Sequence, residues 1–292
     1  MIKSIQKITM TIAVSIKVND GIVLATDSAS TLFAKLPSGD FGVINVYENA
    51  NKIFNLHKEL PVGIITWGSG SIGKASLATL IKDFRKRIMG KDPDYQKWGI
   101  DIENYNIENI SKKFKEFIYD EHYKKAFEDS EQKPIIGFLV AGYSSRERMA
   151  EEWRLEINSK GECLGPYQAR EKERCGLSWN GEPEAITRLY FGFSTALPTV
   201  LKKSGIPDEK VKGIIENCKK DLCAPMVFDP MPIQDVIDLA IFLVDTTKNF
   251  LRFIPGAPTV GGPIEVAAIT KHEGYKWVAR KFYYEQKYNL RE

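Results

Sequence analysis

Two short apolar segments near the N-terminus, joined by an Asn-Asp-Gly turn, constrain the fold of this chain most strongly. Residues 11–18, TIAVSIKV, alternate apolar and polar positions, which is typical of a strand with one buried face. Asn19-Asp20-Gly21 follows, and Asp-Gly is a strong hairpin signal because glycine adopts a positive φ at little cost. Residues 22–26, IVLAT, are apolar enough to be buried on both faces. The sequence therefore predicts an antiparallel hairpin.

Three residues around this hairpin point to one kind of chemistry. Thr11 opens the first strand, Asp27 closes the second, and Lys52 begins a third apolar segment. A threonine at the amino end of a chain carries both a nucleophilic hydroxyl and its own base, because the α-amine has an ordinary pKa of about 7.7–8.0. A lysine cation beside it favours the neutral amine and the developing alkoxide, and a carboxylate holds that lysine charged and oriented.

The stretch TIAVSIKVNDGIVLATDSAS, followed by NKIF and PVGIITWGSG, resembles the start of a proteasome β-type subunit. These proteins are N-terminal-nucleophile hydrolases, related to the bacterial HslV and Anbu peptidases. Counted from Thr11, Asp27 falls at the family's acidic position and Lys52 at its catalytic lysine. The segment GGPIEVAAITKHEGYKWVAR is similar to the family's ending of Gly-Gly, strand, turn and strand. The likeness covers about the first ninety residues and the last thirty.

The resemblance implies an α+β fold, a four-layer αββα sandwich of two antiparallel sheets flanked by helices. It implies one domain over residues 1–292, with 1–10 as a propeptide or upstream extension. The implied function is a threonine-type amide hydrolase, with a peptidase as the favoured case, in which Thr11 becomes the N-terminal nucleophile. Lys52 would lower the pKa of its amine, Asp27 would orient Lys52, and a backbone amide near Gly68 would bind the oxyanion.

No metal or organic cofactor is needed for this chemistry. The expected partners are a peptide or other amide substrate, further copies of the chain in a homo-oligomer or ring, and an unfoldase. These expectations belong to the resemblance and not to any motif in the sequence.

Three departures from the family pattern leave an alternative open. Met10 precedes Thr11 in place of glycine, Asn180 stands at the position of a supporting serine, and Ala257 or a neighbouring residue stands at that of a supporting aspartate. They favour a non-catalytic proteasome-like subunit that acts as an assembly or binding scaffold, as the family's α-type subunits do. A translation start at Met10 with methionine removal is a further hypothesis. It exposes Thr11 without self-cleavage, and N-terminal sequencing of the native chain tests it.

Composition narrows the class of protein. The chain has 292 residues and a net charge of +3, too weakly basic to indicate binding to nucleic acid or to an anionic membrane. Residues 8–18 do not read as a signal peptide and no apolar run reaches membrane-spanning length, so we expect a cytoplasmic protein. Its four cysteines and three histidines are scattered without a Cys-x-x-Cys pair, which argues against a zinc site.

Two further motifs offer alternative functions. Residues 68–73, GSGSIG, have the glycine spacing of a dinucleotide site, but no second strand ending in an acid completes that unit. Ser71-x-x-Lys74, Ser178-x-Asn180 and residues 203–205 follow the order of serine-acyl-enzyme motifs, yet 203–205 end a helix instead of lying on a strand. We favour the threonine interpretation over both.

The periodicity of the remaining chain predicts further elements. Residues 28–50 are expected to be an irregular surface insertion with a short strand at 43–47, and 160–173 a polar connection. The expected strands are 52–56, 62–67, 134–143, 152–158, 174–178, 263–270 and 275–280. The expected helices are 71–89, 107–128, 182–204, 208–223 and 234–250, and 282–292 form a polar tail. The helix 234–250 is apolar almost all round, which indicates core burial and a subunit contact equally.

Overall fold

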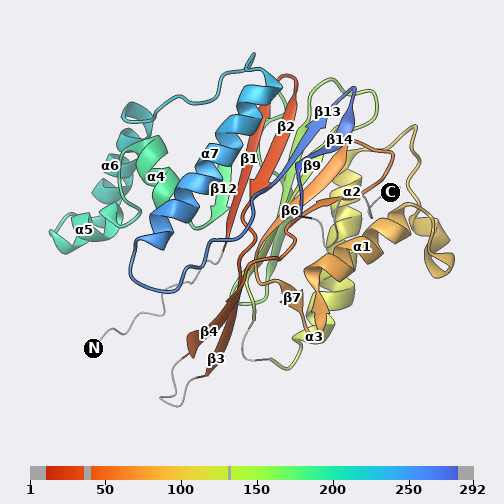
Figure 1. Cartoon of the computed structure of the whole chain (residues 1–292), viewed down its shortest axis with the longest axis horizontal. Coiled ribbons are helices and arrows are strands. Elements are labelled where there is room, and N and C mark those ends of the chain that lie inside the picture. Colours follow the sequence, from red (N-terminus) through yellow and green to blue (C-terminus); the bar gives the residue numbers. More distant parts are fainter. Residues whose placement is uncertain (1–10, 36–40, 131–132, 282–292) are drawn as a thin grey trace.

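The computed structural model describes residues 11–35, 41–130 and 133–281, and they form a mixed α+β structure of antiparallel sheets and helices (Figure 1). The first five-stranded sheet has the order β12-β1-β2-β13-β14, formed by Gly176–Gly181, Ile12–Val18, Gly21–Thr26, Glu265–Thr270 and Gly274–Ala279. The second has the order β11-β10-β9-β6-β5, formed by Cys163–Gln168, Glu151–Ile157, Ile136–Gly142, Val62–Gly68 and Ile53–Asn55. The expected propeptide 1–10 and tail 282–292 lie outside the described residues.

The N-terminal hairpin is confirmed. Strands β1 and β2 pair antiparallel with Val18 opposite Gly21, so Asn19 and Asp20 form the turn. The expectation that β1 buries only one face is wrong, because every residue of the strand is buried. Its polar face is covered as well, since Ser15 donates a hydrogen bond to Glu152 of β10 (2.6 Å). A satisfied hydroxyl is as compatible with burial as an apolar side chain.

Apolar side chains pack the helices onto the sheets and the sheets onto each other. Helices α4 (Glu184–Phe191) and α7 (Ile233–Arg252) share a buried cluster with β1, β2 and β13. Helices α1 (Leu77–Ile88) and α2 (Ile107–Lys115) share another with β6, β9 and β10. A third cluster, which includes Leu24, Trp67 and Leu139, lies between the two sheets. In Figure 1 the two groups of helices accordingly flank the strands on opposite sides.

The most apolar helix, α7, buries one face only. Val236, Ala240 and Leu243 pack against the first sheet, whereas Phe242 on the other side is 49% exposed. Core burial therefore explains one face of this helix, and the expected subunit contact stays a prediction.

Residues 28–50 are more regular than expected. They form a two-stranded antiparallel sheet of β3 (Ser30–Lys35) and β4 (Phe41–Tyr47) that projects from the body of the molecule in Figure 1. Leu32, Ile44 and Tyr47 are exposed, so the surface position was correct while the irregular structure was not. Strands β3 and β4 pair with each other and not with a larger sheet. Neither strand therefore needs the alternating apolar pattern by which a strand with one buried face is recognised.

Other boundaries also differ from the expectation. The polar connection 160–173 contains edge strand β11, whose outer side faces solvent and so lacks an apolar pattern. The expected helix 182–204 is divided into α4 and α5 (Leu197–Lys203), because Gly192 adopts φ +74° and ends α4. The expected strand 174–178 is β12, which continues to Gly181.

The structure also differs from the expected helices 71–89 and 107–128. Residues 71–76 form the small hairpin β7 (Ser71–Ile72) and β8 (Ala75–Ser76), and Ser76 caps α1. The expected helix 107–128 is α2 followed by a π-helical segment, η2 (Glu116–Tyr123), and α3 (Lys124–Ala126). The remaining elements are the 3-10 helix η1 (Pro93–Trp98) and α6 (Asp208–Asp221). None of the described helices has the length and apolar character needed to cross a bilayer.

The packing of α2 yields a prediction on stability. The Phe114 ring is fully buried, with centroids 5.1 Å from Phe84 and 5.0 Å from Phe138. We expect Phe114→Ala to lower the free energy of unfolding by about 3–5 kcal/mol, because it leaves a cavity between the Phe84 and Phe138 rings. Urea unfolding measures this. Phe228→Ala, at a side chain that is 59% exposed, is the control and should change stability by less than about 0.5 kcal/mol. Equal effects of the two variants would contradict the described core.

Candidate active site

The Asp27 carboxylate is the centre of a buried hydrogen-bond cluster. Its Oδ1 accepts from Thr11 Oγ1 (2.6 Å), the Ile12 N–H (3.0 Å) and Lys52 Nζ (2.7 Å). Its Oδ2 accepts from the N–H groups of Ala29 (2.9 Å) and Gly261 (3.1 Å). Asp27 is 0% exposed, so these five donors replace the water that a carboxylate otherwise needs.

The hairpin register explains why Thr11 and Asp27 meet. Ala13 lies opposite Thr26, which places the residue before β1 next to the residue after β2. The backbone of Thr11 is also fixed, because its carbonyl accepts from the Glu182 N–H (2.7 Å) beyond β12. Thr11 therefore enters the site from a strand held on both of its edges.

Lys52 reaches the same site from the other sheet. It precedes β5, and its carbonyl accepts from the Thr66 N–H of β6 (2.9 Å). Its Nζ contacts both Thr11 Oγ1 and Asp27 Oδ1. The structure thus brings together Thr11, Asp27 and Lys52, which the sequence singled out from three separate segments.

Burial alters the acidity of Lys52. Desolvation lowers the pKa of Lys52 from its ordinary 10.5, and the charge and hydrogen bond of Asp27 oppose that shift. A lysine with a lowered pKa exchanges its proton more readily near neutral pH. Strongly perturbed lysines of this kind are frequent at functional sites.

Gly68 ends β6 at the same end of the second sheet as Lys52. It lies two residues beyond Thr66, which is about 7 Å along a strand. Its φ is +87°, and a Cβ at this position would approach the Ile135 carbonyl oxygen to 2.3 Å, so only glycine fits. The expected role of its N–H as oxyanion donor stays a prediction.

Asn180 and Ala257, the two positions that depart from the expected serine and aspartate, lie in different surroundings. Asn180 is buried on β12 opposite Ala13, and its amide oxygen accepts from the guanidinium of Arg154. Ala257 is exposed in the connection between α7 and β13. The structure places the Gly261 N–H, and not a second carboxylate from this connection, against Asp27.

Lys281, Glu265 and Ser28 lie beside the cluster and were not predicted from the sequence as site residues. Lys281 Nζ contacts Ser28 Oγ (2.5 Å), the Ala50 carbonyl (2.6 Å) and Glu265 Oε2 (3.1 Å). Glu265 is buried on β13, and Lys281 follows β14. The available signal was Glu265 itself, a charge within an otherwise apolar strand that follows Gly-Gly.

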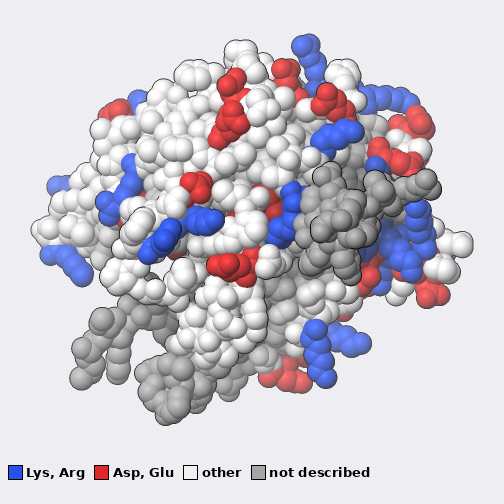
Figure 2. All heavy atoms as spheres, viewed as in Figure 1, with Lys and Arg blue, Asp and Glu red and all other residues white. Residues whose placement is uncertain are grey.

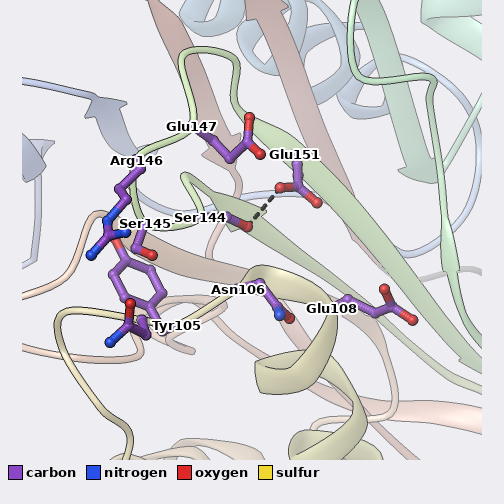
Figure 3. Close-up of a pocket in the computed structure, with 9 residues that line it drawn as sticks. Tyr105, Asn106, Glu108, Ser144, Ser145, Arg146, Glu147 and Glu151 are labelled. Atoms are coloured by element: carbon purple, nitrogen blue, oxygen red, sulfur yellow. Dashed lines mark hydrogen bonds between the residues drawn. The ribbon is translucent and has the colours of Figure 1, made fainter.

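A separate polar cavity of about 400 Å³ lies at the N-terminal end of α2 (Figure 3). Ser144 donates from the end of β9 to Glu151 (2.6 Å), as the dashed line in Figure 3 shows. This end of β9 pairs with Val62, whereas Gly68 pairs with the opposite end, so about 20 Å of strand separates the cavity from Gly68. Within the described ranges, no group of three or more His, Cys, Asp or Glu side chains is arranged to hold a metal ion.

Comparison with known proteins gives a distant likeness only. No family model matches the chain, and no curated protein matches it. Among solved structures it is similar to Anbu (ancestral beta-subunit) from Yersinia bercovieri, at 14% sequence identity and a TM-score of 0.47. That alignment covers 94% of this chain and 89% of the other. The function therefore has to be inferred from the site itself.

The lowered pKa of Lys52 gives stability a defined pH dependence. Between the folded-state pKa of Lys52 and 10.5, the unfolded chain binds more protons than the folded chain, so the contribution of Lys52 to stability rises with pH there. We expect the parent to gain stability relative to Lys52→Met as the pH rises toward 10.5, by up to about 1.4 kcal/mol per pH unit.

Urea unfolding at a series of pH values from neutral to alkaline measures this difference. Lys276→Met, at an exposed lysine of β14, is the matched control and should differ from the parent by a constant amount. A constant difference for Lys52→Met as well would show that Lys52 titrates as an ordinary surface lysine.

Proposed function

We propose that this protein is a threonine-type amide hydrolase, most simply a peptidase, with Thr11 as N-terminal nucleophile once residues 1–10 have been removed. The observation that carries the proposal is the contact of Thr11 Oγ1 with both Asp27 and Lys52 in a buried site. An ammonium group beside a hydroxyl stabilises the alkoxide that forms when the hydroxyl attacks. A carboxylate beside the ammonium keeps it oriented.

In the proposed reaction each site residue has its own role. Thr11 Oγ1 attacks the carbonyl carbon of the amide, and its proton passes to the free α-amine of Thr11, with Lys52 favouring the neutral amine. The N–H of Gly68 is the proposed donor to the oxyanion of the tetrahedral intermediate. The C–N bond then breaks as the leaving amine takes the proton, and an ester to Thr11 remains. Water hydrolyses this ester and regenerates the hydroxyl.

The fold supports the same proposal. We infer that the described sheets and helices form the four-layer αββα sandwich of an N-terminal-nucleophile hydrolase, as a single domain. Three apolar clusters support this arrangement, one between the sheets and one under each group of helices. The proposed partners are a peptide or other amide substrate, further copies of the chain and an unfoldase.

A non-catalytic scaffold is the second candidate, and specific contacts favour it. The side chain of Asn180 is engaged by Arg154, and Ala257 is exposed, so neither supplies the polar group that a free Thr11 amine would use. A scaffold of this kind would keep the buried cluster for stability alone. Buried ion pairs retained without catalysis are common enough for this alternative to need a direct test.

Variants of a chain that begins at Thr11 test the proposal. Such a chain is produced by starting translation at Met10 and relying on methionine removal. We expect it to cleave members of a panel of fluorogenic peptide amides, and Thr11→Ala to reduce kcat by about 10³-fold or more because the nucleophile is lost. Thr199→Ala, at an exposed threonine of α5, should leave the rate unchanged.

The outcomes separate the two candidates. Equal hydrolysis by the parent and by Thr11→Ala would exclude Thr11 as the nucleophile. A folded chain beginning at Thr11 that cleaves no amide, together with unaltered assembly of Thr11→Ala, would support the scaffold.

A further inference from the structure

A second buried ion pair lies against the Thr11 site. Lys281 and Glu265 form an ion pair of 3.1 Å, with side chains that are 10% and 2% exposed. Placing two charges at such depth requires further hydrogen bonds, because their desolvation is expensive. Lys281 has them: its ammonium group also donates to Ser28 Oγ and to the Ala50 carbonyl.

These contacts join the segments that carry the site residues. Ser28 follows Asp27 directly, and Ala50 lies two residues before Lys52. The Ala50 N–H also donates to the Ser28 carbonyl (2.9 Å). Ser28 Oγ in turn donates to the Pro263 carbonyl (2.6 Å), and Glu265 lies opposite Thr26 in the first sheet. One ammonium group thus fixes the Asp27 segment to the Lys52 segment.

The charges of the two pairs act on one another. Among the contributions to the acidity of Lys52, the cation of Lys281 lowers its pKa and the anion of Glu265 raises it, after burial and Asp27. The charge of Asp27 likewise favours the protonated form of Lys281. Two carboxylates and two ammonium groups therefore form a buried set with no net charge.

The described strands on either side of Lys52 add no further charge. Strands β5 and β6, which flank it, carry no charged residue. Described ionisable groups near this end of the sheets include Arg154 of β10, which is paired with Glu156, the exposed Glu48 near Gly261 and Gly262, and the exposed Arg280 next to Lys281.

We propose that Lys281 and Glu265 are positioning residues of the Thr11 site, which hold Lys52 against Thr11 and set how firmly Lys52 keeps its proton. The catalytic meaning of this inference rests on the proposed function, while the effect on Lys52 can be measured without any turnover. The pair acts through Lys52 and Asp27 and does not touch the substrate.

Charge removal has opposite consequences at the two positions. Glu265→Gln removes an anion, so Lys52 should lose its proton at a lower pH than in the parent. Lys281→Met removes a cation, so Lys52 should lose its proton at a higher pH. At the distances of neighbouring buried charges, each shift should be roughly half a pH unit or more. A purely structural role would not give shifts of opposite sign.

The titration of Lys52 is followed by NMR in full-length protein labelled with ¹³C at lysine Cε. The Lys52 signal is the one that disappears in Lys52→Arg. Glu273→Gln and Lys276→Met, at exposed charges of the same β13–β14 hairpin, are the matched controls and should leave the signal at its parental midpoint. Lys281→Arg keeps the cation and should also leave it there.

The proposal predicts a lower midpoint in Glu265→Gln and a higher one in Lys281→Met. Unchanged midpoints, or shifts in the same direction, would overturn it. If a single variant does not fold, the double variant Glu265→Gln/Lys281→Met is used in its place. The double variant removes both charges of the pair and so leaves neither buried without its partner. The double variant removes the contacts by which Lys281 joins Ser28, Ala50 and Glu265, so its Lys52 midpoint should differ from that of the parent, and an unchanged midpoint would overturn the proposal.

Turnover then separates this inference from the proposed function. In an active chain that begins at Thr11, the pH profile of kcat/KM should move in the same direction as the Lys52 midpoint for each variant. Opposite midpoint shifts in a chain that cleaves no amide would support the ion-pair proposal and contradict the proposed function.

Discussion

The structure around the Thr11 site depends on one carboxylate. Asp27 is buried and accepts five hydrogen bonds, from Thr11, Ile12, Ala29, Lys52 and Gly261. These donors belong to both ends of the N-terminal hairpin, to the segment before β5 and to the segment before β13. The space-filling view in Figure 2 shows mixed charges over one face of the molecule, whereas this carboxylate lies inside. A buried charge of this kind is stable only while its donors stay in place, so it holds the segments together.

We propose that the cluster serves the chemistry of Thr11 more than it serves stability. Replacing buried ion pairs by apolar residues often stabilises a protein, so two adjacent pairs at one end of the sheets are weak evidence for a stabilising role. Their burial lowers the pKa of both Lys52 and Lys281. Groups with shifted pKa values that contact a nucleophile are frequent at active sites. In the proposed hydrolase the Lys52 cation favours the neutral amine of Thr11, whereas a scaffold would keep the cluster for stability alone.

The sequence predicted the parts that depend on local pattern. The hairpin, the helix 234–250 and the closing hairpin follow from periodicity and turn residues. The joint role of Thr11, Asp27 and Lys52 was expected because their spacing resembles that of the proteasome β-type family. Strand β11 was missed because an edge strand shows little apolar alternation. Lys281 and Ser28 are 253 residues apart and meet only through sheet order, so no local signal could pair them. Asn180 and Ala257 were matched to supporting positions by the resemblance alone, and no local pattern indicated that Asn180 would accept a hydrogen bond from Arg154 or that Ala257 would be exposed.

The central claim is that Thr11 serves as an N-terminal nucleophile, and the state of its amine decides it. The most direct measurement is the intact mass, with N-terminal sequencing, of the protein purified from its native host. Our account predicts a chain that begins at Thr11, with a free amine beside Lys52. A chain that retains residues before Thr11, and stays unprocessed while the protein is folded and assembled, would contradict it.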